Sequence, residues 1–295
     1  MVNSMDNELH APTEIQTSPL VTTEEKTQIE TAVSVPSVPY LHVVQRCDVG
    51  AVRQRNEDSS LIFSSETGGH FQMMPFGLYV VADGMGGHEN GHMASRIASR
   101  MAARHILNHI YLPLLQDDSA ANQEPIQEVM ETAVLAAHKA IYDPESISDS
   151  GTTLSVALIL SRRLYVAHVG DSRVYLLADD KFEAITNDHS LVQHLQDVGD
   201  LTPEQAAAYQ YRNVLLRAVG QTEELEIDTY TRRLPQSGRL LLCSDGLCGF
   251  VPDPVIQKIM QQKVPLEKIA DKLVATAMNA GGYDNITAIV VEFAF

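Results

Sequence analysis

The chain has 295 residues, 44% of them hydrophobic and 20% charged, which is enough to bury one large core or two modest ones. Its 38 acidic residues outnumber its 21 basic ones, and the net charge of −17 argues against a nucleic-acid partner, because phosphate backbones select basic surfaces. No apolar run approaches the length of a membrane span and the N-terminus lacks a signal-peptide pattern, so we expect no membrane association and a cytoplasmic location.

The cysteine content agrees with that location. Cys47, Cys243 and Cys248 form an odd and sparse set. A disulfide framework or a zinc site would need more ligands, so we expect reduced thiols in a cytoplasmic protein.

Residues 1–40 read as a disordered acidic tail. The segment is rich in Ser, Thr, Pro, Gln and Glu, has no sustained hydrophobic period, and sets six acids against one lysine, Lys26. Residues 41–295 are therefore expected to form a single domain.

Short strands and paired helices follow in order. Alternating or apolar runs predict strands at 41–47, 60–63, 78–82, 152–160, 164–169, 173–177, 182–185, 227–233, 239–243 and 286–293. Apolar residues at helical spacing predict helices around 93–102, 125–142, 253–261 and 265–279, and residues 186–221 read as mixed and partly helical. This order predicts an α+β fold in which a sheet core is covered by helix pairs.

Acidic residues recur at the ends of these strands. Three predicted strands run into Asp83, Asp171 and Asp245, and two more are preceded by Asp58 and Asp284. A single Asp beside Gly is usually a turn, but five such acids predict a ring of carboxylates on one rim of the sheets. A ring of like charges repels itself unless cations neutralise it, so the pattern implies two or more divalent ions.

Paired hard metal ions suit phosphoryl transfer, because they activate water and stabilise the leaving oxygen. Arg53, in the first acidic loop, can bind phosphate oxygens in a bidentate manner. His88, after the Asp83 glycine loop, titrates in the range that suits protonation of the leaving group. We interpret His92, His105 and His109 as surface or packing histidines.

Several motifs together resemble one family, the metal-dependent serine/threonine protein phosphatases of the bacterial PPM (2C) type. They occur in the order of that family and span residues 41–295. They are Arg53-x-x-Asn56-Glu57-Asp58-Ser59, Asp83-Gly84-Met85-Gly86-Gly87-His88, Ser150-Gly151-Thr152-Thr153, Gly170-Asp171-Ser172-Arg173, Asp188-His189-Ser190-Leu191-Val192, Cys243-Ser244-Asp245-Gly246-Leu247 and Asp284-Asn285-Ile286-Thr287.

The resemblance implies a four-layer α-β-β-α sandwich, in which two antiparallel sheets are flanked by helix pairs and the metals bind at one end. It implies hydrolysis of phosphoserine and phosphothreonine by direct attack of a water that two Mn²⁺ or Mg²⁺ ions activate, without a phosphoenzyme. Bacterial members add a third ion.

The resemblance also assigns metal ligands by position. Asp83 would bridge the two main ions. The carbonyl of Gly84 would join one of them, and the carboxylates of Asp245 and Asp284 would join the other.

The remaining assignments concern weaker metal contacts. Asp58 and Glu57 would hold metal-bound water. By holding this water, Asp58 would also act as a catalytic residue. Asp171, together with Asp245, would form the third and weaker metal site.

Two further residues match catalytic positions of the family. Arg53 would bind the phosphate, and His88 would protonate the leaving oxygen. Residues 186–220 match the mobile flap, whose sequence varies with substrate.

Three functions stay open at this point. The first is an active phosphatase, expected to be a monomer that acts on the protein substrates of a serine/threonine kinase. The second is a catalytically weak regulatory or binding member, which the loss of Asp83, Asp245 or Asp284 would have indicated; all three are present. The third is a small-molecule phosphatase of the same fold, which a panel of phosphopeptides and sugar phosphates would distinguish from the first.

Overall fold

The computed structural model describes residues 39–66, 75–86, 90–115, 124–143, 150–207 and 209–295. Nearly all of the predicted tail, residues 1–38, lies outside the described residues, and so does His88. The helices and strands all belong to the unit that begins at Ser37 and ends at Phe295.

Two antiparallel sheets form the centre of this unit. Sheet A has the strand order β1-β11-β10-β7-β8. Its strands are β1 (Tyr40–Asp48), β11 (Ile286–Ala294), β10 (Ser237–Cys243), β7 (Arg173–Ala178) and β8 (Lys181–Ala184).

Sheet B has the order β2-β3-β5-β6-β9, and a short β4 pairs with β3 beside β5. Its strands are β2 (Asp58–Ser65), β3 (Phe76–Met85), β4 (Gly151–Thr152), β5 (Leu154–Leu160), β6 (Arg163–Val169) and β9 (Asp228–Arg233). Each named pairing in both sheets is antiparallel.

Strand β3 shows why the central strands read as continuous apolar runs. Leu78 and Val80 pack toward the helices, whereas Tyr79 and Val81 pack into the layer between the two sheets. All four side chains are fully buried, because a central strand of a covered sheet faces core on both sides. Burial of each such side chain contributes about 1.5–3 kcal/mol.

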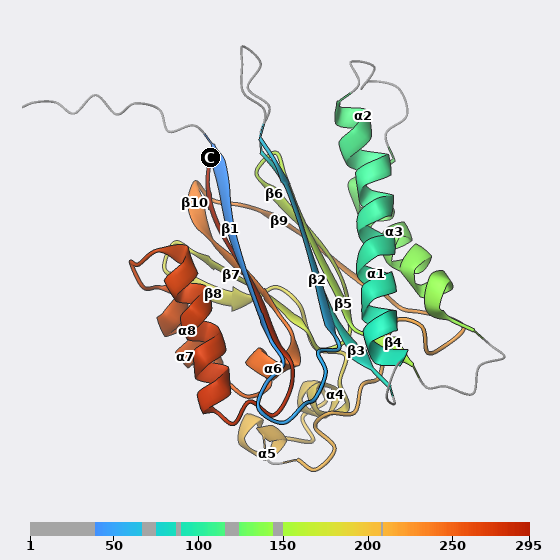
Figure 1. Cartoon of the computed structure of the whole chain (residues 1–295), viewed down its shortest axis with the longest axis vertical. Helices are drawn as coiled ribbons and strands as arrows, with labels where there is room; N and C mark the ends of the chain where they lie inside the picture. The colour runs from blue at the N-terminus through green and yellow to red at the C-terminus, as the bar shows by residue number, and fades with distance from the viewer. Residues whose placement is uncertain (1–38, 67–74, 87–89, 116–123, 144–149, 208) are drawn as a thin grey trace, which may run out of the picture. The chain divides into compact units, whose positions relative to one another are not determined.

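Helices cover the outer face of each sheet (Figure 1). Sheet B is covered by α1 (Asn90–Ile106), continued through a π-helical turn, η1 (Leu107–Tyr111), and α2 (Leu112–Leu114), and by α3 (Ile126–Ile141). Sheet A is covered by α7 (Asp253–Met260) and α8 (Leu266–Asn279), with the short α6 (Asp245–Cys248) beside them. The predicted four-layer α-β-β-α sandwich is confirmed.

Two more helices lie within the segment predicted to be a flap, α4 (Leu191–Asp197) and α5 (Pro203–Ala207). Ser190 caps α4, since its hydroxyl accepts a hydrogen bond from the amide of Gln193 at 3.2 Å. An isolated antiparallel bridge between Ser190 and Leu215 closes the base of the segment. None of the helices in the described part of the chain is long and apolar enough to span a bilayer.

Three local features differ from the sequence prediction. β2 begins at Asp58 rather than at residue 60, and β3 continues through Asp83 to Met85, because Asp58 and Asp83 are themselves paired across the two strands. The predicted strand 152–160 is divided at Thr153 into β4 and β5. Helix α6 was not predicted, since four residues are too short to show a helical period.

Candidate active site

The register of sheet B brings three predicted site residues to one rim. Asp58, the first residue of β2, lies directly opposite Asp83 near the end of β3. Asp171 follows the end of β6. Thr153, between β4 and β5, hydrogen-bonds to Asp83 and to the residue after Asp171, so the three acidic segments meet at this end.

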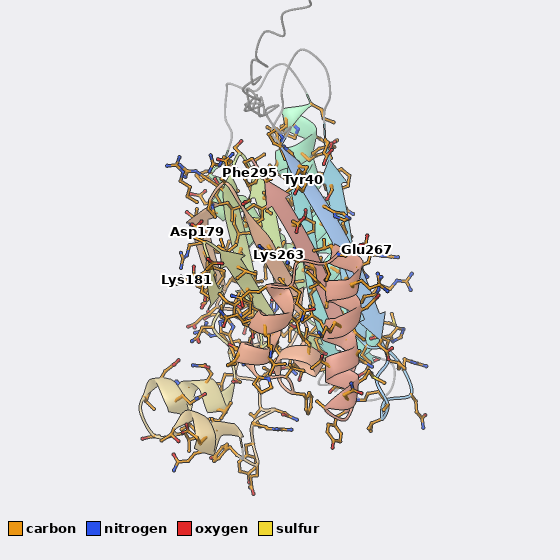
Figure 2. All side chains as sticks on the ribbon, turned by 90° about the vertical axis from the view of Figure 1, so that its left-hand side faces the viewer. Tyr40, Asp179, Lys181, Lys263, Glu267 and Phe295 are labelled. Carbon is orange, nitrogen blue, oxygen red and sulfur yellow. The ribbon has the colours of Figure 1, made fainter. Side chains whose placement is uncertain are left out.

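Sheet A adds two more acids at the same rim. Cys243, the last residue of β10, pairs with Ala288 near the start of β11. Asp245, just after β10, and Asp284, just before β11, therefore lie at one end of neighbouring strands. Figure 2 looks onto the α7–α8 side and shows Tyr40 and Phe295 at the end of the strands away from α4 and α5.

The backbone of Asp83 is fixed on both sides. Its amide donates to the hydroxyl of Thr153 at 2.9 Å, and its carbonyl accepts from the amide of Thr153 at 2.8 Å and from the hydroxyl of Thr152 at 2.9 Å. The carboxylate is therefore carried by a backbone that cannot shift without breaking three hydrogen bonds.

Two of the rim acids each have an oxygen that lacks a partner. The Oδ2 atom of Asp58 accepts from the hydroxyl of Ser244 at 2.7 Å. Within the described residues, Oδ1 of Asp58 and Oδ1 of Asp245 are buried without any hydrogen-bond partner. A buried carboxylate oxygen without a partner costs free energy, which a bound cation would recover.

The raised pKa values of the rim acids likewise show that their negative charges are buried at a cost. Burial first, and neighbouring carboxylates in addition, raise the pKa of Asp58 to about 7 and that of Asp245 to about 6. The pKa values of Asp83 and Asp171 are also raised well above the ordinary value, first by burial and then by nearby acids. Without a cation, the cluster therefore retains protons that divalent ions would displace.

Gly84, whose carbonyl the resemblance assigns to a metal ion, is packed closely against the backbones of Glu57 and Gly91. Its amide donates to the carbonyl of Glu57 at 3.2 Å. A Cβ at this position would overlap the carbonyl oxygen of Gly91 and lie 2.8 Å from that of Glu57, so only glycine fits. The hydroxyl of Ser95 in α1 also donates to Glu57, at 2.6 Å, which ties the start of α1 to the rim.

The donor set fits Mg²⁺ or Mn²⁺. Carboxylate and carbonyl oxygens are the ligands that such hard cations prefer. In the part of the chain that the structure describes, no three His, Cys, Asp or Glu side chains form a ready-made metal cage. Water and backbone carbonyls would therefore complete the coordination of each ion.

Arg53 lies at the rim, where its guanidinium forms an ion pair with Asp284. Its Nη2 atom is 2.6 Å from Oδ2 of Asp284, and its side chain is about half exposed, at 48%. This hydrogen bond raises the pKa of Arg53, so the residue is a permanent cation. A guanidinium at this place can leave Asp284 for a phosphate oxygen without crossing the protein interior.

Asn285, which the sequence reasoning left without a role, holds the loop that carries Arg53. Its Nδ2 atom donates to the carbonyls of Val49 and Arg55, both at 2.9 Å, and its Oδ1 atom accepts from the amide of Glu57 at 2.7 Å. The sequence offered one hint of this role: Asn285, whose side-chain amide can both donate and accept hydrogen bonds, directly follows the rim acid Asp284.

A cavity of about 210 Å³ lies between the rim and the segment predicted to be a flap. Its rim side includes Asp171 and Asp245, and its flap side includes Asp188, Arg212 and Asn213. The floor is stiffened by Arg173, which forms a bidentate ion pair with Asp188 at 2.8 and 2.7 Å.

The structure thus brings together most of the residues singled out from the sequence: Arg53, Glu57, Asp58, Asp83, Gly84, Asp171, Asp245 and Asp284. Glu57 reaches the rim through its backbone contacts. The place of His88 lies outside the described residues.

Known proteins of similar sequence and structure cover the same region. The sequence profile of the family described as protein phosphatase 2C matches residues 52–281. A serine/threonine phosphatase of Listeria innocua, stp, is 36% identical over 252 residues, which are 85% of this chain and 96% of that protein.

Two solved structures agree with this match. The serine/threonine phosphatase PstP/Ppp of Mycobacterium tuberculosis has a TM-score of 0.68 and 32% identity, covering 86% of this chain and 99% of its own. The catalytic domain of PstP, in complex with two manganese ions, has a TM-score of 0.69 with the same identity and coverage. The family match includes most of the rim acids, namely Asp58, Asp83, Asp171 and Asp245, and ends just before Asp284.

Proposed function

Because the chain belongs to the protein phosphatase 2C family, we propose that the carboxylate rim is the active site at which it works as a metal-dependent protein serine/threonine phosphatase. The enzyme hydrolyses phosphoserine and phosphothreonine and depends on Mn²⁺ or Mg²⁺. One observation carries the location of the site: buried carboxylates with raised pKa values and partnerless oxygens converge where the two sheets meet.

We infer the metal ligands from the resemblance to this family, and the positions of the rim acids support the assignment. The PstP catalytic domain holds two manganese ions, and here Asp83, the carbonyl of Gly84, Asp245 and Asp284 would hold two. Asp171, with Asp245, would hold a third ion. When bound, the ions supply the positive charge that activates water and stabilises the leaving oxygen.

The protein's own residues position the substrate and move protons. Arg53 would donate to phosphate oxygens from the rim, with Asp284 holding its guanidinium in place until substrate arrives. Asp58 and Glu57 would orient water at the site, and Ser244 fixes the carboxylate of Asp58 for that task. His88 would give a proton to the leaving seryl or threonyl oxygen.

The biological setting is inferred from the same chemistry. We propose that the substrates are proteins phosphorylated by a serine/threonine kinase, that the enzyme acts as a monomer, and that it acts in the cytoplasm. Free thiols at Cys47, Cys243 and Cys248 are compatible with a reducing compartment.

The division of the chain also remains a proposal. We infer that residues 41–295 form one phosphatase domain with a flap at 186–220, and that the acidic segment 1–40 is dispensable for chemistry. The described chain from the start of β1 to the end of β11 contains each of the rim acids, which supports this division.

The test is phosphate release from a phosphothreonine peptide, with Mn²⁺ and after EDTA, for the wild type and Asp83→Asn. We expect turnover only for the wild type with Mn²⁺, and slower turnover of sugar phosphates. Turnover by Asp83→Asn at the wild-type rate would refute the site, and a preference for sugar phosphates would favour a small-molecule phosphatase.

A further inference from the structure

A pair of buried hydroxyl groups connects the backbone segments that carry two of the rim acids, Asp83 and Asp171. The Oγ1 atom of Thr153 and the Oγ atom of Ser172 are 2.7 Å apart, and the two residues are 2% and 0% exposed. Thr153 also accepts the amide of Asp83, and Ser172 directly follows Asp171 in the chain. The pair therefore connects the backbone of one proposed ligand with the turn that carries another.

The turn at Asp171 is packed against the same threonine. Gly170 has a φ of +110°, in the region that favours glycine. A Cβ on Gly170 would lie 2.6 Å from Cβ and Cγ2 of Thr153, so the turn rests on that side chain. Any change in the Thr153–Ser172 contact would therefore move Asp171 relative to Asp83.

Ser172 is also held from its other side. The hydroxyl of Ser155 donates to the carbonyl of Ser172 at 3.1 Å and lies 2.9 Å from Nδ1 of His168. The Nε2 atom of His168 lies 3.2 Å from the carbonyl of Asn187. His168 lies in β6 and is fully buried, so the hydrogen bonds around Ser155 and Ser172 are shielded from water.

We propose that Thr153 and Ser172 are positioning residues that set the separation of Asp83 and Asp171 and so tune the affinity of the third metal ion. This inference rests on the proposed function, since it takes both acids as ligands. Residues that orient a metal ligand typically affect affinity by about 10- to 100-fold, because a carboxylate displaced by a fraction of an ångström no longer matches the ion.

Ser172→Ala is the cleanest variant, because it removes the hydroxyl pair but leaves the hydrogen bond from Asp83 to Thr153. Mn²⁺ binding would be measured from the EPR signal of free Mn²⁺ during titration. Asp171→Asn, which should lack the weakest binding step, identifies that step. We expect Ser172→Ala to weaken this step about tenfold or more and to leave the tighter steps unchanged.

Three further variants separate positioning from general stability. Thr153→Val breaks the pair from the other side and should also weaken the Asp171-dependent step, which keeps the test valid if Ser172→Ala does not fold. Thr153→Ser retains the hydroxyl but loses Cγ2, so it should weaken the step less than Thr153→Val does. Tyr79→Phe removes another fully buried hydroxyl from β3, next to Ser64, and should lower the Tm without changing Mn²⁺ binding.

The outcomes distinguish this inference from the proposed function. Normal Mn²⁺ titrations for both Ser172→Ala and Thr153→Val would overturn the inference, and so would a Thr153→Ser variant as weak as Thr153→Val. If the wild type releases phosphate with Mn²⁺ in those cases, the proposed function still stands. If Asp171→Asn binds as many ions as the wild type, Asp171 is no ligand and the inference falls with that assignment.

Discussion

Arg53 and His88 are proposed to act at different moments of the reaction, and their removal should differ accordingly. Arg53 would contact phosphate oxygens before and during the reaction, so Arg53→Ala should raise KM and lower kcat/KM. His88 matters only as the leaving oxygen departs, so His88→Ala should lower kcat on a phosphoserine peptide by roughly 100-fold.

The choice of leaving group provides the measurement. On p-nitrophenyl phosphate, whose phenolate needs little protonation, His88→Ala should approach the wild-type kcat, whereas Arg53→Ala should stay impaired. Steady-state kinetics on both substrates would decide the matter. Equal losses for His88→Ala on the two substrates would show that it is not the general acid.

His168 should make the protein sensitive to acid. Burial lowers the pKa of this histidine to about 3, whereas in the unfolded chain it is near the ordinary value of about 6.5. Between those values the unfolded state binds more protons, so the contribution of His168 to stability is present above pH 6.5 and is lost as the pH falls toward 3.

His168→Asn keeps a hydrogen-bonding group near the Nδ1 position but does not titrate. We expect the variant to be less stable than the wild type at pH 7, and the difference to shrink as the pH falls toward 4. Urea unfolding of both proteins across this range measures it. Other titrating groups are common to the two proteins, so a constant difference would contradict the assigned burial.

At the level of residues, the sequence was sufficient to single out the charged groups but not their supports. Asp58, Asp83, Asp171, Asp245 and Asp284 were evident because acids at strand ends are conspicuous. The supporting residues are small and neutral, and such residues occur throughout any chain. Their role depends on partners far away in the chain, 236 positions for Asn285 and Val49, and only the folded structure brings these together.

At the level of elements, the short helix α6 leaves little room for a change at Gly246. It begins at Asp245, directly after β10, and Gly246 packs against the loop before β11. A Cβ on Gly246 would overlap the carbonyl oxygen of Asn285, which cannot move without shifting Asp284. The backbone contact thus sets the distance between two proposed ligands of one ion.

Gly246→Ala should therefore cost stability and activity together. Overpacking of this kind costs about 1–3 kcal/mol, and the displaced acid should lower Mn²⁺-dependent turnover as well. Gly199→Ala is the control: its Cβ would meet nothing within 4 Å, so only the strain of a φ of +85° remains, about 1 kcal/mol. Urea unfolding and turnover of both variants test this, and a fully active Gly246→Ala would contradict it.

Elements with a strong periodic signal were predicted within a few residues, including α3, α8 and β11. The prediction failed where pairing, not side-chain pattern, sets the boundary. β2 starts at a charged residue because that residue has a partner in β3, and α6 is a four-residue helix, too short to show a hydrophobic period. Neither feature produces a hydrophobic periodicity that could be recognised in the sequence.

For the whole molecule, the acidic rim trades stability for metal affinity. Burial raises the pKa of Asp245 to about 6, so without metal the folded state binds more protons than the unfolded state between about pH 4 and 6. Stability of the metal-free protein should therefore fall as the pH rises through this window.

Asp245→Asn removes this cost together with a proposed ligand. At pH 8 in EDTA the variant should have a higher Tm than the wild type, and the gap should close toward pH 4. Mn²⁺ should raise the Tm of the wild type much more than that of the variant, since binding to the folded state stabilises it. Thermal unfolding with and without Mn²⁺ checks this, and near-normal Mn²⁺-dependent activity in the variant would contradict the ligand assignment.

The placement of β11 has a consequence for how the enzyme is made. It is the last strand of the described chain, yet it pairs with β1, the first, and with β10. Until residues 286–294 are in place, β1 therefore has no partner strand in the described part of sheet A, and we expect this long-range pairing to form late in folding. Because the pairing of β10 with β11 brings Asp245 and Asp284 together, we expect the enzyme to be inactive until that pairing forms.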